Sequence, residues 1–236
     1  MRCGHGAAVP GCACARPRRD ALTKPAYWDA ASRALSSADP VLARLVGQFP
    51  GLHLARRNDA FTALCRAIVG QQISVKAADA IWRRLLVRSA PEALDVPFPA
   101  LDPVRVVALS PHELREIGLS GRKGSYVGDL AGHFVEGRLD PAGWSALDDE
   151  ALIEALCDVK GIGRWTAEMF LIFHELRPDV LPVDDIGLQK AVALHYHRGR
   201  RVALSTIRRH GARWRPWRSV ATWYLWRSLD PVPVEY

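Results

Sequence analysis

The sequence has few cysteines, few methionines and no long uncharged apolar run. Its five cysteines among 236 residues include Cys3, Cys12 and Cys14, which lie close together near the N-terminus and do not form the paired framework of a small secreted protein. We therefore expect reduced thiols. The apolar run from Ile162 to Phe173 is interrupted by Glu168, so we expect a soluble protein with no segment that crosses a bilayer.

The N-terminal stretch also lacks the features of a targeting signal. It contains arginines but no continuous apolar core, so it does not resemble a secretory leader and we expect a cytoplasmic protein. Cys3, His5, Cys12 and Cys14 could collect a metal ion, but their spacing lacks the CxxC turn of common zinc sites. We favour a basic, disordered tail over residues 1–24, no metal site, and one folded region over residues 25–236.

Basic residues exceed acidic residues in this chain. There are 32 Lys+Arg against 25 Asp+Glu, which gives a formal net charge of +7 and a pI near 9.5. This balance suits a polyanionic partner, and both nucleic acid and anionic membrane would fit it. The length allows a substantial core in one domain or in two closely packed lobes.

Apolar residues follow helical spacing through most of the chain. Two stripes with the spacing i, i+3, i+4, i+7 and i+8 predict amphipathic helices on both sides of residues 70–74: Phe61, Leu64, Cys65, Ile68 and Val69, then Ala78, Ile81, Trp82, Leu85 and Leu86. Ser110 and Glu113 have the spacing of a capping box, and Asp148 is placed to cap another helix. We expect an all-α protein of about ten helices, with a long connection over residues 87–102 and short extended segments at most, at 180–181 and 200–202.

One turn between two predicted helices has the composition of an anion site. Gly161 and Gly163 bracket one apolar residue, Ile162, and a glycine at each turn position permits a positive φ and leaves backbone N–H groups uncovered at the start of the next helix. Thr166 adds a hydroxyl and Lys160 a positive charge, so the turn is suited to hold a DNA phosphate without reading base sequence. The alternative is an ordinary connection whose glycines only cap and turn.

Further motifs give this turn a family context. With the loop over residues 181–187, Leu-Pro-Val-Asp-Asp-Ile-Gly, it resembles the signature of the helix-hairpin-helix base-excision DNA glycosylases. Residues 68–74 resemble the strand-probing turn, and residues 214–219 the C-terminal signature, of the alkylation-repair branch, the 3-methyladenine DNA glycosylase II type. The resemblance extends over residues 25–236 and implies an all-α glycosylase domain of two packed helical lobes with a cleft between them.

The resemblance also implies roles for individual residues. Asp185 matches the catalytic aspartate, with Asp184 as the alternative, since one member of the pair could serve only as a helix cap. Trp165, Met169 and Trp226 match positions that line the base pocket, although a tryptophan is often simply a core residue. Gln72 occupies the intercalating position, and the alternative is a solvated glutamine at a helix end. Lys160, Gly161, Gly163 and Thr166 match the phosphate-binding hairpin.

Two departures from related enzymes restrict the expected chemistry. Endonuclease III-type relatives have a nucleophilic lysine two residues after the second hairpin glycine, where this chain has Trp165. Without that amine we expect no lyase activity. No cysteine follows Cys157, so we expect neither the C-terminal iron–sulfur cluster of that branch nor any other cofactor.

The sequence as a whole therefore predicts an enzyme rather than a binding module. We expect a monofunctional DNA glycosylase that flips alkylated purines, such as 3-methyladenine, out of duplex DNA and excises them, leaving an abasic site. It should act as a monomer on damaged double-stranded DNA and associate with the nucleoid only through that DNA. The alternative is a catalytically silent helix-hairpin-helix module that merely grips phosphates.

Overall fold

The computed structural model describes residues 24–94, 96 and 98–229, and the proposed tail with its possible metal ligands lies outside them except for Lys24. These residues form twelve α-helices and two short 3-10 helices, and no strand occurs among them. The helices are α1 (Trp28–Ala38), α2 (Pro40–Gln48), α3 (Ala60–Gly70), α4 (Val75–Ser89), η1 (Pro91–Ala93), α5 (Pro103–Val107), α6 (Pro111–Glu116), α7 (Gly121–Val135), η2 (Pro141–Ala146), α8 (Asp149–Cys157), α9 (Arg164–Phe173), α10 (Ile186–His197), α11 (Leu204–Arg213) and α12 (Arg218–Leu229).

The helix starts that were predicted from capping residues are confirmed. Ser110 Oγ accepts the backbone N–H of Glu113 at 3.2 Å, and the Glu113 carboxylate accepts the backbone N–H of Ser110 at 2.8 Å, so α6 begins with a complete capping box. Asp148 caps α8 by accepting the N–H of Ala151 at 2.8 Å. Such side-chain acceptors replace the intrahelical carbonyls that first-turn N–H groups lack.

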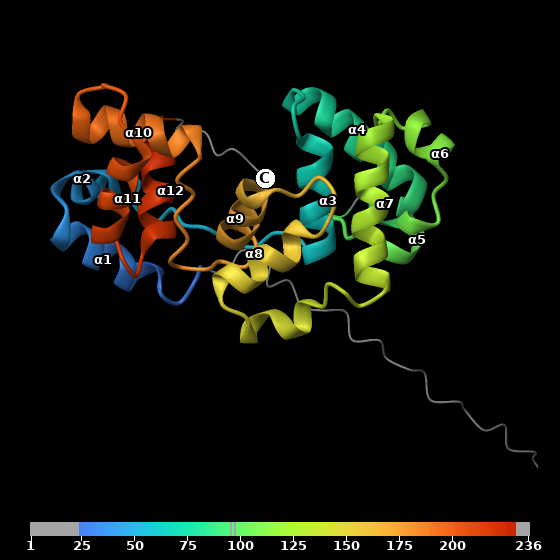
Figure 1. Ribbon diagram of the computed structural model, residues 1–236, viewed down its shortest axis with the longest axis horizontal. Helices are drawn as coiled ribbons and strands as arrows, with labels where there is room; N and C mark the ends of the chain where they lie inside the picture. Colours follow the sequence, from blue (N-terminus) through green and yellow to red (C-terminus); the bar gives the residue numbers. More distant parts are fainter. Residues whose placement is uncertain (1–23, 95, 97, 230–236) are drawn as a thin grey trace, which may run out of the picture.

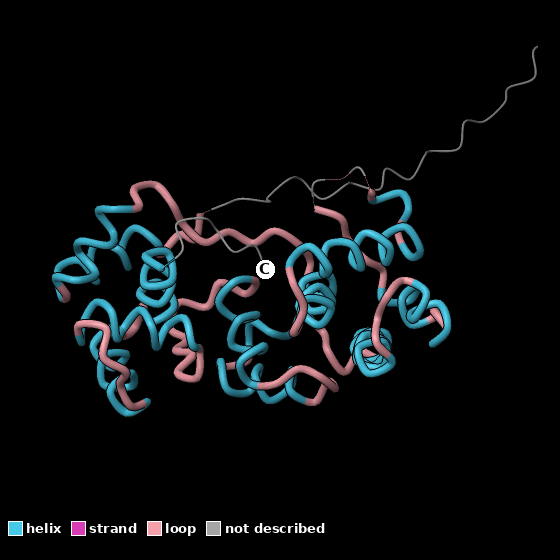
Figure 2. Tube along the Cα trace, turned by 90° about the horizontal axis from the view of Figure 1, so that it is seen from above, coloured by secondary structure: helices cyan, strands magenta, loops and turns pink. Residues whose placement is uncertain are grey.

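The helices gather into two groups (Figure 1). The first two helices, α1 and α2, pack with α10 and α12 in the group that also holds α11, while α3 to α7 form the other group. Helices α8 and α9 lie between them, and the tube view shows the same division (Figure 2). Trp28 Nε1 donates to the hydroxyl of Tyr224 at 3.3 Å, which joins α1 to α12 across 196 residues of sequence. The expected two-lobed, all-α fold is thus confirmed.

The details differ from the sequence-based expectation in three places. Helix α4 continues to Ser89 and η1 follows it directly, so the predicted long connection over residues 87–102 is shorter and partly helical. The described residues contain twelve α-helices rather than about ten, and the short helix α5 was not expected. Neither suggested extended segment pairs as a strand; the N–H of Val180 donates instead to Ser219 Oγ at 2.9 Å. Within the described ranges, no helix is both long enough and apolar enough to span a membrane.

Candidate active site

The turn between α8 and α9 forms the predicted hairpin. Gly161 has a φ of +86°, and a Cβ at this position would lie 2.1 Å from the ring of Tyr126 on α7. Only glycine satisfies both the left-handed backbone and this close approach. The expectation of a positive φ at the first hairpin glycine is confirmed, and its packing partner, Tyr126, was not identified from the sequence.

The second hairpin glycine does not have the predicted conformation. Gly163 has φ −94° and ψ 171°, an extended geometry that any residue adopts, so the expectation of a positive φ there is wrong. The physical reason is its position as N-cap of α9, where β-region dihedrals are usual. A Cβ on Gly163 would meet nothing within 4 Å, and α9 has no side-chain cap. This glycine therefore leaves open space in front of the helix N-terminus, where an anion is favoured.

The two other residues predicted to bind phosphate, Lys160 and Thr166, differ in exposure. Lys160 is exposed, with its Nζ 3.2 Å from Oδ1 of Asp129, and its backbone N–H donates to Oδ2 of the same residue at 2.9 Å. Burial acts to raise the pKa of Asp129, but the contacts from Lys160 outweigh it and hold that pKa below its usual range. Thr166 is only 8% exposed. Asp129 on α7 thus anchors the hairpin, a role that no sequence motif indicated.

The turn between α3 and α4 contacts this hairpin directly. Gln72 is exposed and has a φ of +57°, a conformation that residues other than glycine adopt rarely. Its neighbour Gln71 donates from Nε2 to the carbonyl of Gly161 at 2.9 Å, and Lys123 donates from Nζ to the carbonyl of Val69 at 2.7 Å. The first bond joins the predicted strand-probing turn to the hairpin, the second joins it to α7, and Gln72 stays exposed on the turn.

Asp185 stands at the centre of the predicted catalytic residues. It is the N-cap of α10, and its Oδ1 accepts the N–H of Leu188 at 2.6 Å and Nε1 of Trp226 at 2.7 Å. Its Oδ2 accepts Nε1 of Trp165 at 3.0 Å. Asp184 is exposed and does not cap the helix. The sequence left open that one aspartate only caps the helix and the other is catalytic. In the structure, Asp185 both caps α10 and accepts hydrogen bonds from the two tryptophans, so the cap and the predicted catalytic position coincide in one residue.

The predicted pocket residues differ in exposure. Trp165 is 40% exposed, so it is not a core residue. Trp226 is partly buried and stacks on Phe173 with ring centroids 5.5 Å apart and an interplanar angle of 11°. A Cβ on Gly187 would lie 3.0 Å from Asp185 Oδ1 and 3.1 Å from the Trp226 ring, so this glycine allows the aspartate and the indole to meet. Met169 is buried, at 6% exposure, within the apolar core.

A buried carboxyl group beside this site was missed by sequence reasoning. Glu168 is 4% exposed and accepts Nε of Arg164 at 3.0 Å. Arg164 also donates through both terminal nitrogens to Glu150 on α8, at 2.8 and 2.6 Å. Burial raises the pKa of Glu168 to about 7, against the opposing effect of Arg164. The i, i+4 spacing of Arg164 and Glu168 was the available signal.

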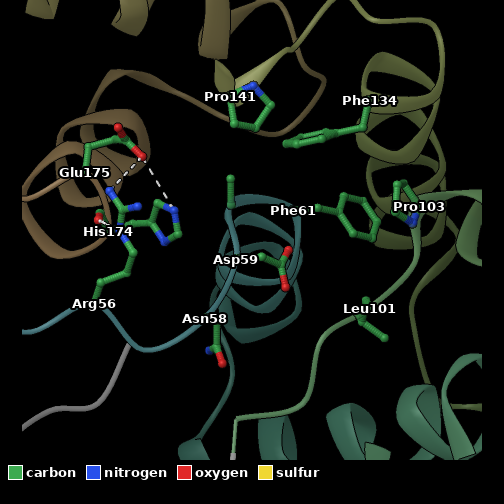
Figure 3. A pocket seen from close by; sticks show the side chains of 11 residues that line it. Arg56, Asn58, Asp59, Phe61, Leu101, Pro103, Phe134, Pro141, His174 and Glu175 are labelled. Carbon is green, nitrogen blue, oxygen red and sulfur yellow. Dashed lines mark hydrogen bonds and ion pairs between the residues drawn. The ribbon is translucent and has the colours of Figure 1, made fainter. Parts of the chain in front are cut away.

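A separate cavity of about 450 Å³ lies at the other end of α9 (Figure 3). It is lined by apolar rings such as Phe61 and Phe134 and by the polar residues Arg56, His174 and Glu175. Nε of Arg56 donates to the carbonyl of His174 at 2.7 Å. His174 caps the C-terminus of α9, whereas Trp165 lies in its first turn, so this cavity is not the space beside Asp185. Within the described part of the chain, no group of three or more His, Cys, Asp and Glu side chains could hold a metal ion.

The chain is similar in sequence to known DNA repair proteins. The family described as "HhH-GPD superfamily base excision DNA repair protein" matches residues 65–216. The chain is 33% identical over 190 residues to DNA-3-methyladenine glycosylase 1 of Schizosaccharomyces pombe, covering 79% of this chain and 80% of that protein. It is 32% identical over 198 residues to DNA-3-methyladenine glycosylase 2 of Escherichia coli, covering 82% of this chain and 66% of that protein.

Solved structures give the same result. A DNA-3-methyladenine glycosidase from Bacillus halodurans superposes with a TM-score of 0.75 at 32% identity, covering 85% of this chain and 89% of that one. The 3-methyladenine DNA glycosylase of S. pombe, solved in complex with abasic DNA, has a TM-score of 0.72 at 28% identity and covers 88% of this chain and 98% of that one. The chain belongs to the HhH-GPD superfamily of base excision DNA repair proteins.

Proposed function

We propose that this protein is a monofunctional DNA glycosylase that excises alkylated purines, such as 3-methyladenine, from duplex DNA and leaves an abasic site. The observation that carries the proposal is the placement of the Asp185 carboxylate between the indole N–H groups of Trp165 and Trp226. The names of the relatives from S. pombe and E. coli support the choice of substrate.

The geometry suits a reaction in which positive charge develops on a sugar. When the N-glycosidic bond breaks, its electron pair leaves with the base and the deoxyribose becomes oxocarbenium-like. A carboxylate held in place by three N–H donors stabilises that charge without having to reorganise. Water then adds to the anomeric carbon, which gives the abasic sugar. Asp185 is the residue that we assign to this role.

The aromatic residues suit an electron-poor base. Trp165 exposes 40% of its surface next to Asp185, and an alkylated purine, which is often cationic, gains about 0.5–2 kcal/mol from contact with a tryptophan face. We assign Trp165, Met169 and Trp226 to the base pocket. Gln72, exposed on its turn, would occupy the space that a flipped base vacates.

The lysines near the site support chemistry without a covalent step on the sugar. Lys123 donates to the carbonyls of Val69 and Gln71, and Lys160 pairs with Asp129. The position that carries the nucleophilic lysine in lyases is occupied here by Trp165, which is bonded to Asp185. We therefore assign strand cleavage to another enzyme and require no cofactor for base release.

The decisive experiment uses methylated duplex DNA. Incubation with the protein should release methylated purines, identified by chromatography, and the strand should stay intact until it is treated with alkali. Borohydride should trap no covalent adduct. Release of no base by the wild-type protein, with duplex binding retained, would favour the silent binding module. Nicking without alkali would contradict the monofunctional assignment.

A further inference from the structure

Much of the positive charge of this chain lies in the segment that contains its last three described helices, residues 186–229. From Ile186 to Leu229 the sequence contains ten lysines and arginines and no aspartate or glutamate. Residues 24–185, which include the hairpin, contain 18 basic and 22 acidic residues and have a net charge of −4. The basic character that suits a polyanionic partner therefore comes from the C-terminal segment rather than from the hairpin region.

The structure places many of these arginines in solvent without acidic partners. Six of them are exposed and have no ion pair within the described residues: Arg198, Arg200, Arg201, Arg208, Arg209 and Arg213. By contrast, Arg215 and Arg218 both pair with Asp179. An exposed arginine without a carboxylate partner is available to an external anion such as a phosphate.

Three of these arginines lie on one face of helix α11. Ser205, Arg208, Arg209, Ala212 and Arg213 are exposed at the spacing i, i+3, i+4, i+7 and i+8, which is one helical face. We call these five residues the α11 basic face. The other two residues of this face, Ser205 and Ala212, have short side chains, so a bulky anionic backbone can approach the helix closely.

The opposite side of α11 is fixed to the segment that carries Asp185. Ile207 and Gly211 are buried, and a Cβ on Gly211 would lie 2.3 Å from Leu181, four residues before Asp185. The N-terminal end of α11 also lies near the site, because Arg201 to Leu204 line a common hollow with Gln189. Gln189 is four residues after Asp185, about 6 Å along the α10 axis.

We propose that the α11 basic face, together with the arginines at 198, 200 and 201, binds the phosphate backbone of the same duplex on one flank of the damaged base. The inference rests on the proposed function for the choice of DNA as partner. The basic region begins beside the catalytic carboxylate and extends for the length of α11, about 15 Å. Contacts there would hold the duplex without reading its sequence, in addition to those of the hairpin.

The test compares Arg208→Glu/Arg209→Glu with a matched control, Arg33→Glu/Arg115→Glu. All four arginines are exposed, and none has an ion pair in the described part of the chain. Both variants change the net charge equally. Affinity is measured on a long duplex of about 30 base pairs with a central abasic-site analogue, and on a short duplex that ends about two base pairs beyond the analogue on the flank facing α11, over a range of salt concentrations.

We expect the α11 variant to bind the long duplex about 10- to 100-fold more weakly, with a salt-dependence slope lower by about two. The short duplex and the control variant should show little loss. Arg208→Gln/Arg209→Gln, with unchanged circular dichroism, should show the same pattern more weakly.

Three results in the affinity measurements would overturn the inference. These are unchanged long-duplex affinity, an equal loss in the control variant, or an equal loss on both duplex lengths. Recruitment of a second, undamaged duplex that depends on Arg208 and Arg209 would assign the face to another DNA molecule and also contradict it. Affinity for the abasic-site analogue is measured without base release. Failure of this inference is therefore distinguishable from failure of the proposed function, in which the wild-type protein would not excise methylated purines.

Discussion

Nε1 of Trp226 donates to Oδ1 of Asp185 across 2.7 Å, so a predicted wall of the base pocket also holds the predicted catalytic carboxylate. The two roles can be separated by substitution. A ring that lacks the N–H can still stack on Phe173, but it cannot position the aspartate.

We expect Trp226→Phe to fold normally and to lose excision rate by about 10- to 100-fold, because a hydrogen bond to a charged group contributes about 1.5–3 kcal/mol. Nonspecific DNA affinity should stay near the wild-type value, since the phosphate contacts are elsewhere. The measurements are single-turnover base release and thermal unfolding. A variant with full excision rate would limit Trp226 to packing.

The neighbouring aspartates should differ sharply in their response to amide substitution. Asp185→Asn deletes the charge aimed at the sugar and keeps a side chain that caps helices well, so base release should fall by about 10²-fold or more with little loss of stability. Asp184→Asn changes an exposed side chain and should retain most activity. Excision by the first variant at the wild-type rate, or loss in the second alone, would contradict the assignment.

The two hairpin glycines offer a matched pair of alanine substitutions. Gly161→Ala places a methyl group 2.1 Å from the Tyr126 ring at a positive φ, so we expect a loss of about 1–3 kcal/mol in unfolding free energy. Gly163→Ala enters open space at the N-cap and should cost at most about 1 kcal/mol. The same methyl should weaken duplex binding about tenfold, because it lies where a phosphate would approach. Equal effects of the two variants in thermal unfolding and DNA binding would refute this distinction.

Glu168 should make stability depend on pH near neutrality. Burial raises its folded-state pKa from 4.5 to about 7, so the folded protein binds this proton more tightly than the unfolded chain. Its contribution is most favourable below pH 4.5 and is lost as the pH rises to about 7. His174, whose pKa burial lowers to about 3, acts in the opposite direction, so the informative quantity is the difference from Glu168→Gln.

That difference in unfolding free energy should change between pH 4.5 and about 7 in favour of the glutamine variant, by about 1–3 kcal/mol, and stay constant above this range. Denaturant unfolding at a series of pH values measures it. Parallel pH profiles for the wild-type protein and the variant would show that Glu168 does not titrate in this window.

Local patterns in the sequence were sufficient for many of the helices and for the caps of α6 and α8, whereas the residues around Asp185 were identified from the family resemblance. The capping box of α6 and the apolar stripes of α3 and α4 depend on neighbours within a few residues, which the sequence displays. The partners that hold the site together are remote. Gln71 and Gly161 are 90 residues apart, and Lys160 and Asp129 are 31 apart. No short motif encodes such tertiary pairs.

The conformation of single residues was also beyond the sequence. Gly161 and Gly163 have the same chemical freedom, yet only Gly161 uses it, with a φ of +86°, whereas Gly163 has the β-region dihedrals of the N-cap of α9. Similarly, the sequence allowed either Asp184 or Asp185 to cap α10, and in the structure Asp185 is the N-cap.

The hydrogen bond from Gln71 to the carbonyl of Gly161 fixes the spacing between two parts of the protein that we propose contact the same DNA strand. It joins the turn that bears Gln72 to the hairpin that we propose binds a phosphate, so the protein itself would set the spacing between that phosphate and the base step next to Gln72. An enzyme built in this way would need no recognition of sequence to align a lesion with Asp185. Each shift along the duplex by one phosphate would present the next nucleotide to the carboxylate at the same offset.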